Sequence, residues 1–238
     1  MEIKLLHLYD DVMNLYGEYA NVAVLARCLC GMGHTVTVDT LSLYEEKNVD
    51  GYDFYYMGAG TERKQKLVLP QLLRYRAPLR AAFDSGKVML FTGNAFELLG
   101  ARVTDAAGTA FDALGFAPFE TVESNRRITG DVLARCEMLS DTLVGFMNKC
   151  SKTTGVESPL FALDMGFGNE AQRGAEGFIA NNCFGTHLSG PILVKNPHFL
   201  RKIASLLTGE ECTVSDSNME AAYRTTLAAL QARLQAAK

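Results

Sequence analysis

Short apolar segments alternate with longer amphipathic ones through the first hundred residues, and this alternation constrains the fold more than any other feature of the sequence. Strands are expected at residues 3–9, 53–57 and 88–92, and the apolar run at 3–9 is typical of a strand buried on both faces of a sheet. A further strand is expected at residues 35–41 (TVTVDTL), which are β-branched and alternate polar with apolar side chains. Helical patterns occupy residues 16–31 and 62–85, where Pro70 and Pro78 are expected to bend or split the second helix. Strands that alternate with helices predict an α/β fold with a doubly wound, mostly parallel sheet.

The second half of the chain is less regular. Further strands and helices are expected there, at residues 127–134, 142–147, 197–207 and 219–237. The polar stretch at 209–217 is expected to be a mobile connection before the last helix. With 238 residues, 48% of them hydrophobic, the chain can bury a sizeable core. We therefore expect one domain over residues 1–208, followed over residues 209–238 by a connection and a C-terminal helix that packs on the same domain.

Composition argues against several classes of function. The formal net charge of −4 disfavours a nucleic-acid-binding protein, because such domains are usually basic. No apolar run approaches the roughly 18 residues of a membrane span, and the N-terminus lacks the basic and apolar regions of a secretion signal. Six cysteines and four histidines show no zinc-binding spacing. We therefore expect a cytoplasmic protein with neither a bound metal nor a cofactor.

Three turns are the candidates for a functional site. Gly93 and Asn94 follow the strand at 88–92, at the edge where open α/β sheets bind ligands, and a helix is expected to begin around Phe96. The small residues Gly-Ala-Gly at 58–60 allow backbone N–H groups to approach a ligand and to stabilise an oxyanion. His187 lies in a turn between glycines, where an imidazole can act as a base near neutral pH. Each feature also has a purely structural interpretation, respectively a packing corner, a tight turn and a loop histidine bonded to backbone.

Several motifs, taken in order, resemble those of the cobyric acid synthase-like class I glutamine amidotransferases, and within that family the glutaminase subunits of lipid II isoglutaminyl synthases. The N-terminal signature covers residues 8–17 (LYDDVMNLYG) and continues in Asn21 and Arg27. The Gly-Ala-Gly turn falls on the glycine triplet of the family's oxyanion loop. Three further segments match the nucleophile elbow and the C-terminal signature, namely residues 86–100 (GKVMLFTGNAFELLG), 166–169 (GFGN) and 187–197 (HLSGPILVKNP). The resemblance extends from about residue 3 to about residue 207.

The resemblance implies an amidotransferase-like domain that hydrolyses the side-chain amide of glutamine. In the family a cysteine attacks the amide, a histidine shuttles protons, and ammonia passes to a Mur-ligase-like, ATP-dependent synthetase that amidates the peptidoglycan stem. In this sequence the resemblance assigns His187 as the histidine and places Ala59, Gly60 and Asn94 around the substrate. Arg127 falls where the family holds an arginine that grips the glutamine, and a guanidinium suits a carboxylate. A solvated surface arginine is the alternative for Arg127.

The sequence departs from the family at the nucleophile. The family's C-G-G-Y-Q-L-L-G aligns with residues 93–100 (GNAFELLG), which puts Gly93 at the position of the cysteine, and glycine has no side chain to attack a carbonyl. Glu97 replaces a family glutamine, and the family's E-N-H stretch reads Met-Asn-Lys at 147–149. Ser189 stands two residues after His187, where many class I amidotransferases place a glutamate.

Two hypotheses follow from this departure. In the first, the chain is a binding or regulatory subunit that holds glutamine or another amino acid without hydrolysing it. In the second, it is an active glutaminase subunit that supplies ammonia to a Mur-ligase-like synthetase through a different nucleophile, for which Cys150 is the candidate. A serine hydrolase is disfavoured because the sequence has no G-x-S-x-G motif.

Overall fold

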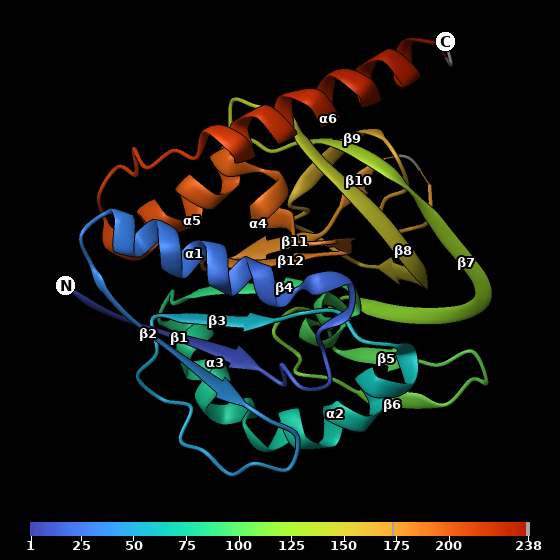
Figure 1. Cartoon of the computed structure of the whole chain (residues 1–238). Coiled ribbons are helices and arrows are strands. Elements are labelled where there is room, and N and C mark those ends of the chain that lie inside the picture. Colours follow the sequence, from blue (N-terminus) through green and yellow to red (C-terminus); the bar gives the residue numbers. More distant parts are fainter. Residues whose placement is uncertain (173, 237–238) are drawn as a thin grey trace.

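Two sheets form the molecule in the computed structural model, which describes residues 1–172 and 174–236 (Figure 1). Within those residues the first, central sheet has six strands, β1 (Glu2–Leu8), β2 (Thr35–Leu41), β3 (Phe54–Met57), β4 (Val88–Thr92), β11 (Phe178–Ala180) and β12 (Cys183–Thr186). The second sheet has seven, β5 (Arg102–Thr104), β6 (Ala110–Asp112), β7 (Glu120–Arg135), β8 (Leu143–Thr154), β9 (Phe161–Met165), β10 (Ala175–Glu176) and β13 (Leu188–Ser189).

The central sheet confirms the predicted doubly wound, mostly parallel arrangement. Its strand order is β11-β12-β4-β3-β1-β2, and every pair of neighbours is parallel except β11 with β12. Alternate residues of each strand point into different cores. Ile3, Leu5 and Phe54 pack with α1 (Tyr19–Gly31) and α5 (Pro197–Thr208), whereas Leu6 and Tyr55 pack with α2 (Glu62–Arg74) and α3 (Arg76–Asp84). Because both faces are covered, β3 and β4 are buried at every position and almost wholly apolar, whereas the edge strand β2 is largely exposed.

The helix expected over residues 62–85 is split into α2 and α3 at Tyr75, between the two prolines. Pro70 lies inside α2 and Pro78 in the first turn of α3, where its missing N–H is tolerated. The helix expected near Phe96 is instead a short 3-10 helix (Gly93–Leu99) that begins at the end of β4. A second 3-10 segment (Leu15–Gly17) precedes α1.

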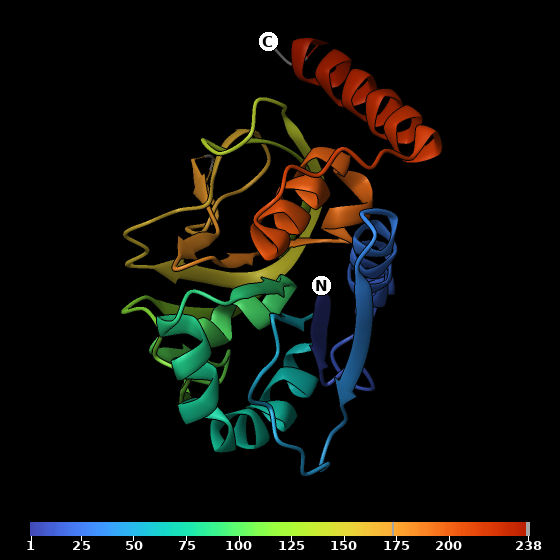
Figure 2. The same cartoon turned by 90° about the vertical axis from the view of Figure 1, so that its left-hand side faces the viewer.

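The second sheet is built on a long antiparallel hairpin, β7–β8, which curves beside the central sheet (Figures 1 and 2). The strands predicted at 127–134 and 142–147 are only parts of it, because β7 and β8 each extend further toward the central sheet. The pairing shifts register between Glu123 and Ile128. This irregular stretch carries the polar residues that reach the candidate site.

The last helix that the structure describes is α6 (Ser217–Ala236), which follows the short helix α4 (Ile192–Lys195) and α5 (Figure 1). Tyr223 and Leu230 of α6 pack on Leu133 and Val144 of the β7–β8 hairpin, and the Tyr223 hydroxyl donates to the Thr142 carbonyl at 2.7 Å. The last two residues of the predicted segment 209–238 lie outside the described residues. Among the described helices, none combines the length and the apolar character needed to cross a bilayer.

Candidate active site

β4 ends in a sharp turn at Gly93. Thr92, the last residue of β4, is extended, whereas Gly93 has a φ of +60°, in the left-handed region that residues with a Cβ rarely adopt. The 3-10 helix begins directly at this residue. A strand, a strained residue and a helix in this order form the elbow that displays the nucleophile in α/β hydrolases. Here the residue at the apex of the elbow is a glycine.

Ala59 takes the space that a side chain at position 93 would fill. A Cβ built on Gly93 would lie 2.5 Å from the Cβ of Ala59 and 3.2 Å from its Cα. The flanking glycines are crowded too: a Cβ on Gly58 would lie 2.7 Å from the Met13 carbonyl oxygen, and one on Gly60 would force the flexible Met13 side chain to move. Ala59 is buried. Positions 59 and 93 therefore share room for one side-chain carbon.

Asn94 holds the 58–60 loop through its side chain. The N–H of Gly60 donates to Asn94 Oδ1 at 2.9 Å, and the Asn94 carbonyl accepts from Gln65 Nε2 at 2.6 Å. Asn94 Nδ2 is buried and makes no hydrogen bond to the described part of the chain. Three residues predicted to surround a substrate, Ala59, Gly60 and Asn94, are thus brought together with Gly93.

His187 is buried between two carboxylates. Its Nδ1 lies 3.2 Å from Glu176 Oε1, and its Nε2 lies 3.4 Å from Glu97 Oε1. Glu176 also accepts from the backbone N–H of His187 and from the Thr186 hydroxyl, each at 2.7 Å. The side chain of His187 is 1% exposed. Both ring nitrogens therefore face carboxylate oxygens.

Glu97 is the carboxylate that faces His187 Nε2. Burial opposes its ionisation, but the interaction with His187 and the hydrogen bonds from Ser151 and Gln65 outweigh it and lower the pKa of Glu97. Gln65 Nε2 donates to Glu97 Oε2 at 2.8 Å. In nucleophilic catalysis the base nitrogen is bonded to the nucleophile, whereas here Nε2 faces an ionised carboxylate.

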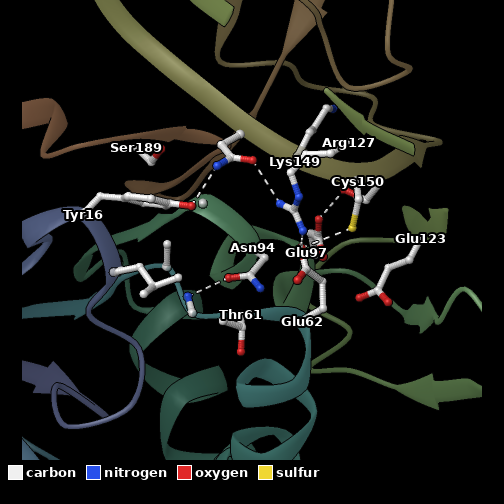
Figure 3. A pocket seen from close by; sticks show the side chains of 16 residues that line it. Tyr16, Thr61, Glu62, Asn94, Glu97, Glu123, Arg127, Lys149, Cys150 and Ser189 are labelled. Carbon is white, nitrogen blue, oxygen red and sulfur yellow. Dashed lines mark hydrogen bonds and ion pairs between the residues drawn. The ribbon is translucent and has the colours of Figure 1, made fainter. Parts of the chain in front are cut away.

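A cavity of about 170 Å³ opens between the elbow and the β7–β8 hairpin (Figure 3). Arg127 of β7 extends across it, where Nη2 donates to Glu62 Oε1 at 2.7 Å and Nη1 to Asn148 Oδ1 at 3.0 Å. Asn148 Nδ2 donates in turn to the Tyr16 hydroxyl at 2.8 Å. Gly93, Asn94 and Glu97 line this cavity together with Arg127, whereas His187 lies behind Glu97 and is not part of the described lining.

Cys150 lines the same cavity, but its thiol is hydrogen-bonded to Glu62 and not to His187. Its thiol donates to Glu62 Oε1 at 3.2 Å, and burial together with this carboxylate raises the pKa of the thiol to about 11. In the described residues no hydrogen bond joins Cys150 to His187. Because the thiolate is the nucleophilic form of cysteine, Cys150 is protonated and weakly reactive at neutral pH.

Lys149, the residue before Cys150, is a buried cation that connects the cavity to the loop after β9. Its Nζ donates to the carbonyls of Gly168 and Asn169 at 2.7 and 3.1 Å. Burial lowers the pKa of Lys149 to about 8. The carboxylates of Glu97 and Glu176 oppose this shift, and they balance part of the buried positive charge.

The elbow is anchored by Glu18, a buried carboxylate at the N-terminus of α1. Glu18 accepts from the Tyr56 hydroxyl at 2.5 Å, from the Thr92 hydroxyl, and from the Gly190 N–H at 2.7 Å. Burial raises the pKa of Glu18, although these hydrogen bonds act in the opposite direction. One carboxylate therefore joins α1, β3, the end of β4 and the loop before α4, directly beside Gly93.

Among the residues that the structure describes, no group of three or more His, Cys, Asp or Glu side chains is arranged to hold a metal ion.

Ser189 lines the cavity, and its hydroxyl donates to the Phe146 carbonyl at 3.4 Å. The carboxylate beside His187 Nδ1 comes instead from Glu176, 11 positions earlier in the chain.

The fold is similar to that of a known amidotransferase. A glutamine amidotransferase from Thermotoga maritima, known from its crystal structure, has a TM-score of 0.53 at 12% sequence identity, and the match covers 94% of this chain and 96% of that one. The CobB/CobQ-like glutamine amidotransferase domain matches residues 4–197. The chain therefore belongs to the CobB/CobQ-like glutamine amidotransferase family, as its motifs predicted.

Within the family, the chain is similar to two subunits of lipid II isoglutaminyl synthases. The chain is 30% identical over 195 residues to "Lipid II isoglutaminyl synthase (glutamine-hydrolyzing) subunit GatD" of Staphylococcus aureus (strain N315), over 82% of this chain and 80% of that subunit. It is 28% identical over 207 residues to the subunit of the same name from Streptococcus pneumoniae (strain ATCC BAA-255 / R6), over 86% of this chain and 80% of that subunit.

Several residues that shape the site were not found by sequence reasoning, among them Glu18, Gln65, Glu62 and Glu176. Glu62 follows the Gly-Ala-Gly turn and binds both Arg127 and Cys150, but its sequence position shows only a helix start. Glu176 belongs to a two-residue strand in a glycine-rich segment. Its complete burial beside His187 depends on contacts that no local pattern encodes.

Proposed function

We propose that the chain is an amidotransferase-like subunit of the lipid II isoglutaminyl synthase type that has no glutaminase activity of its own. It acts as a binding or regulatory subunit of a Mur-ligase-like, ATP-dependent synthetase, and its cavity holds glutamine or another amino acid. The similarity to two GatD subunits supports the assignment to this type of complex. The substitution of the nucleophile supports the absence of hydrolysis.

One observation carries the proposal, namely that the methyl group of Ala59 fills the side-chain space of Gly93. A cysteine lost from an otherwise unchanged elbow would leave an opening the size of its side chain. In this structure the opening is closed, so the elbow is packed as a structural turn. Loss of the nucleophile removes covalent catalysis, and the remaining groups supply only the weak acceleration that binding and oxyanion donors give.

The contacts of His187 also support the absence of glutaminase activity. A general base for glutamine hydrolysis must take a proton from a nucleophile in contact with the substrate. The Nε2 of His187 faces Glu97 instead, and the ring lies outside the described lining of the cavity. His187 therefore serves the buried Glu97–His187–Glu176 cluster, which we propose is structural in this chain.

The alternative is an active glutaminase subunit that uses Cys150, since this thiol does line the cavity. Against it stand the hydrogen bond from Cys150 to Glu62 and the raised pKa of about 11. For attack on an amide, the thiol would need a base within hydrogen-bond reach and an oxyanion donor close to the same carbon. Glu62 is the base within reach, but Arg127 already engages its carboxylate.

Ammonia release from L-glutamine by the purified chain tests the absence of hydrolysis. We expect no release above the rate without protein. Ammonia release that Cys150→Ser abolishes would establish the alternative. The role in a complex is tested by adding a Mur-ligase-like synthetase from the same source with lipid II and ATP. The complex should amidate its acceptor with ammonium chloride but not with glutamine, and amidation driven by glutamine would contradict the proposal.

A further inference from the structure

The side chain of Asn94 accepts the hydrogen bond of the Gly60 N–H, a backbone donor of the 58–60 loop. The Gly60 N–H donates to Asn94 Oδ1 at 2.9 Å, a normal hydrogen-bond length. An N–H that points into a cavity beside a nucleophile elbow is the kind of donor that holds the carbonyl oxygen of a bound amide. In this chain that donor already has an acceptor from within the protein.

The orientation of Asn94 is fixed by its own contacts. Its side-chain oxygen must face Gly60, because only an acceptor can pair with an N–H. Its backbone carbonyl is held by Gln65 Nε2 at 2.6 Å. The NH₂ group is then left buried and without a partner among the described residues. Asn94 thus presents a primary carboxamide in the cavity, which is the same group that ends a glutamine side chain.

The position of this carboxamide agrees with that of a ligand. Asn94 lies between the 58–60 loop on one side and Glu97 and Arg127 on the other (Figure 3). Gly60, Asn94 and Arg127 line the same cavity, so a bound glutamine whose amide oxygen accepted from the Gly60 N–H would need the place that Asn94 Oδ1 now occupies. The two groups cannot share a single N–H at normal hydrogen-bond distance.

We propose that Asn94 is an internal occupant of the carboxamide subsite, and that it determines which amino acids the cavity accepts. Glutamine binds only when the Asn94 side chain turns away from Gly60, whereas amino acids without a carboxamide have no need of that donor. The inference rests on the proposed function in one respect, because it takes an amino acid as the ligand of the cavity.

Calorimetric titration of the full chain with L-glutamine tests the inference. Asn94→Gly removes the occupant and should bind glutamine at least about fivefold more tightly than the native chain, which is the order of factor that the net value of one hydrogen bond gives. Asn94→Ala, which restricts the backbone more than glycine does, should show the same gain. Asn94→Asp keeps the acceptor oxygen and the shape of the side chain, so it should remain as weak as the native chain.

A second measurement follows the donor itself. In Asn94→Gly and Asn94→Ala the Gly60 amide proton loses its acceptor, so its hydrogen exchange should accelerate, and added glutamine should slow it again. In the native chain glutamine should leave that exchange unchanged. Thermal unfolding of each variant shows that the comparison is made on folded protein.

Two results would overturn the inference. One is a glutamine affinity in Asn94→Gly and Asn94→Ala no tighter than in the native chain. The other is a gain of the same size in Asn94→Asp. Neither result bears on the absence of hydrolysis, since ammonia release by the native chain is measured separately. Conversely, ammonia release by the native chain would refute the proposed function whatever the affinities of the Asn94 variants.

Discussion

Substituting Gly93 by alanine measures how completely Ala59 fills the elbow. The new Cβ would lie 2.5 Å from the Ala59 Cβ, whereas carbon atoms pack at about 3.5–4.0 Å, so the neighbours must move apart by roughly 1 Å. Overpacking of a dense core costs about 1–3 kcal/mol, and the left-handed backbone costs a residue with a Cβ about 1–2 kcal/mol more. We expect Gly93→Ala to lower the free energy of unfolding by about 2–5 kcal/mol, a large share of the ~5–15 kcal/mol typical of a domain.

The double variant Ala59→Gly/Gly93→Ala separates these two costs. Ala59→Gly alone removes one buried methyl group, which costs about 1 kcal/mol. With that methyl absent, Gly93→Ala meets only the backbone cost, so it should be about 1–3 kcal/mol less damaging than in the native background. Urea unfolding followed by circular dichroism gives the four free energies of this cycle. A coupling energy near zero would refute the idea that positions 59 and 93 share one space.

Two further predictions concern the buried charges beside the cavity. The native pKa of Glu97 lies below the ordinary 4.5, so the unfolded chain binds more protons and native stability falls as the pH drops below about 5. Urea unfolding from about pH 7 to about pH 3 should show a flatter decline of stability in Glu97→Gln than in the native chain. Parallel curves for the two proteins would contradict the lowered pKa of Glu97. The native pKa of Lys149 is about 8 against an ordinary 10.5, so the unfolded chain binds more protons between these values and native stability rises there with pH. The stability of the native chain relative to Lys149→Met should therefore increase from about pH 7 to about pH 10, and a constant difference would show that Lys149 titrates normally.

The inner strands β3 and β4 were predictable because they are buried at every position and read as continuous apolar runs. The edge strand β2 is largely exposed, and it was predictable from its alternating β-branched residues. The predicted strands at 35–41 and 88–92 coincide with β2 and β4. The first half of β7 was not predictable. The middle of the strand is exposed and polar, and its pairing with β8 shifts register between Glu123 and Ile128. A strand without regular alternation resembles a loop when only the sequence is read.

The site was predictable as a group of motifs but not as a set of contacts. The family resemblance placed Gly93, Asn94 and Arg127 near one pocket, and the structure places all three in the lining of the cavity. The contact between Ala59 and Gly93 depends on β3 and β4 being neighbours in the sheet and on where each strand ends. The role of His187 depends on Glu97 and Glu176, and the burial of their carboxylates is set by tertiary packing.

The buried network around Glu18 has a consequence for the shape of the elbow. The turn at Gly93 is held by hydrogen bonds that end on Thr92, Tyr56 and Gly190, and none of them involves the side chain at the apex. These hydrogen bonds therefore hold the turn without a side chain at position 93, whereas the neighbouring Ala59 is what restricts that position to glycine. The sharp turn at the end of β4 therefore persists with a glycine at its apex, because side chains from the start of α1, from β3 and from β4 hold it in place.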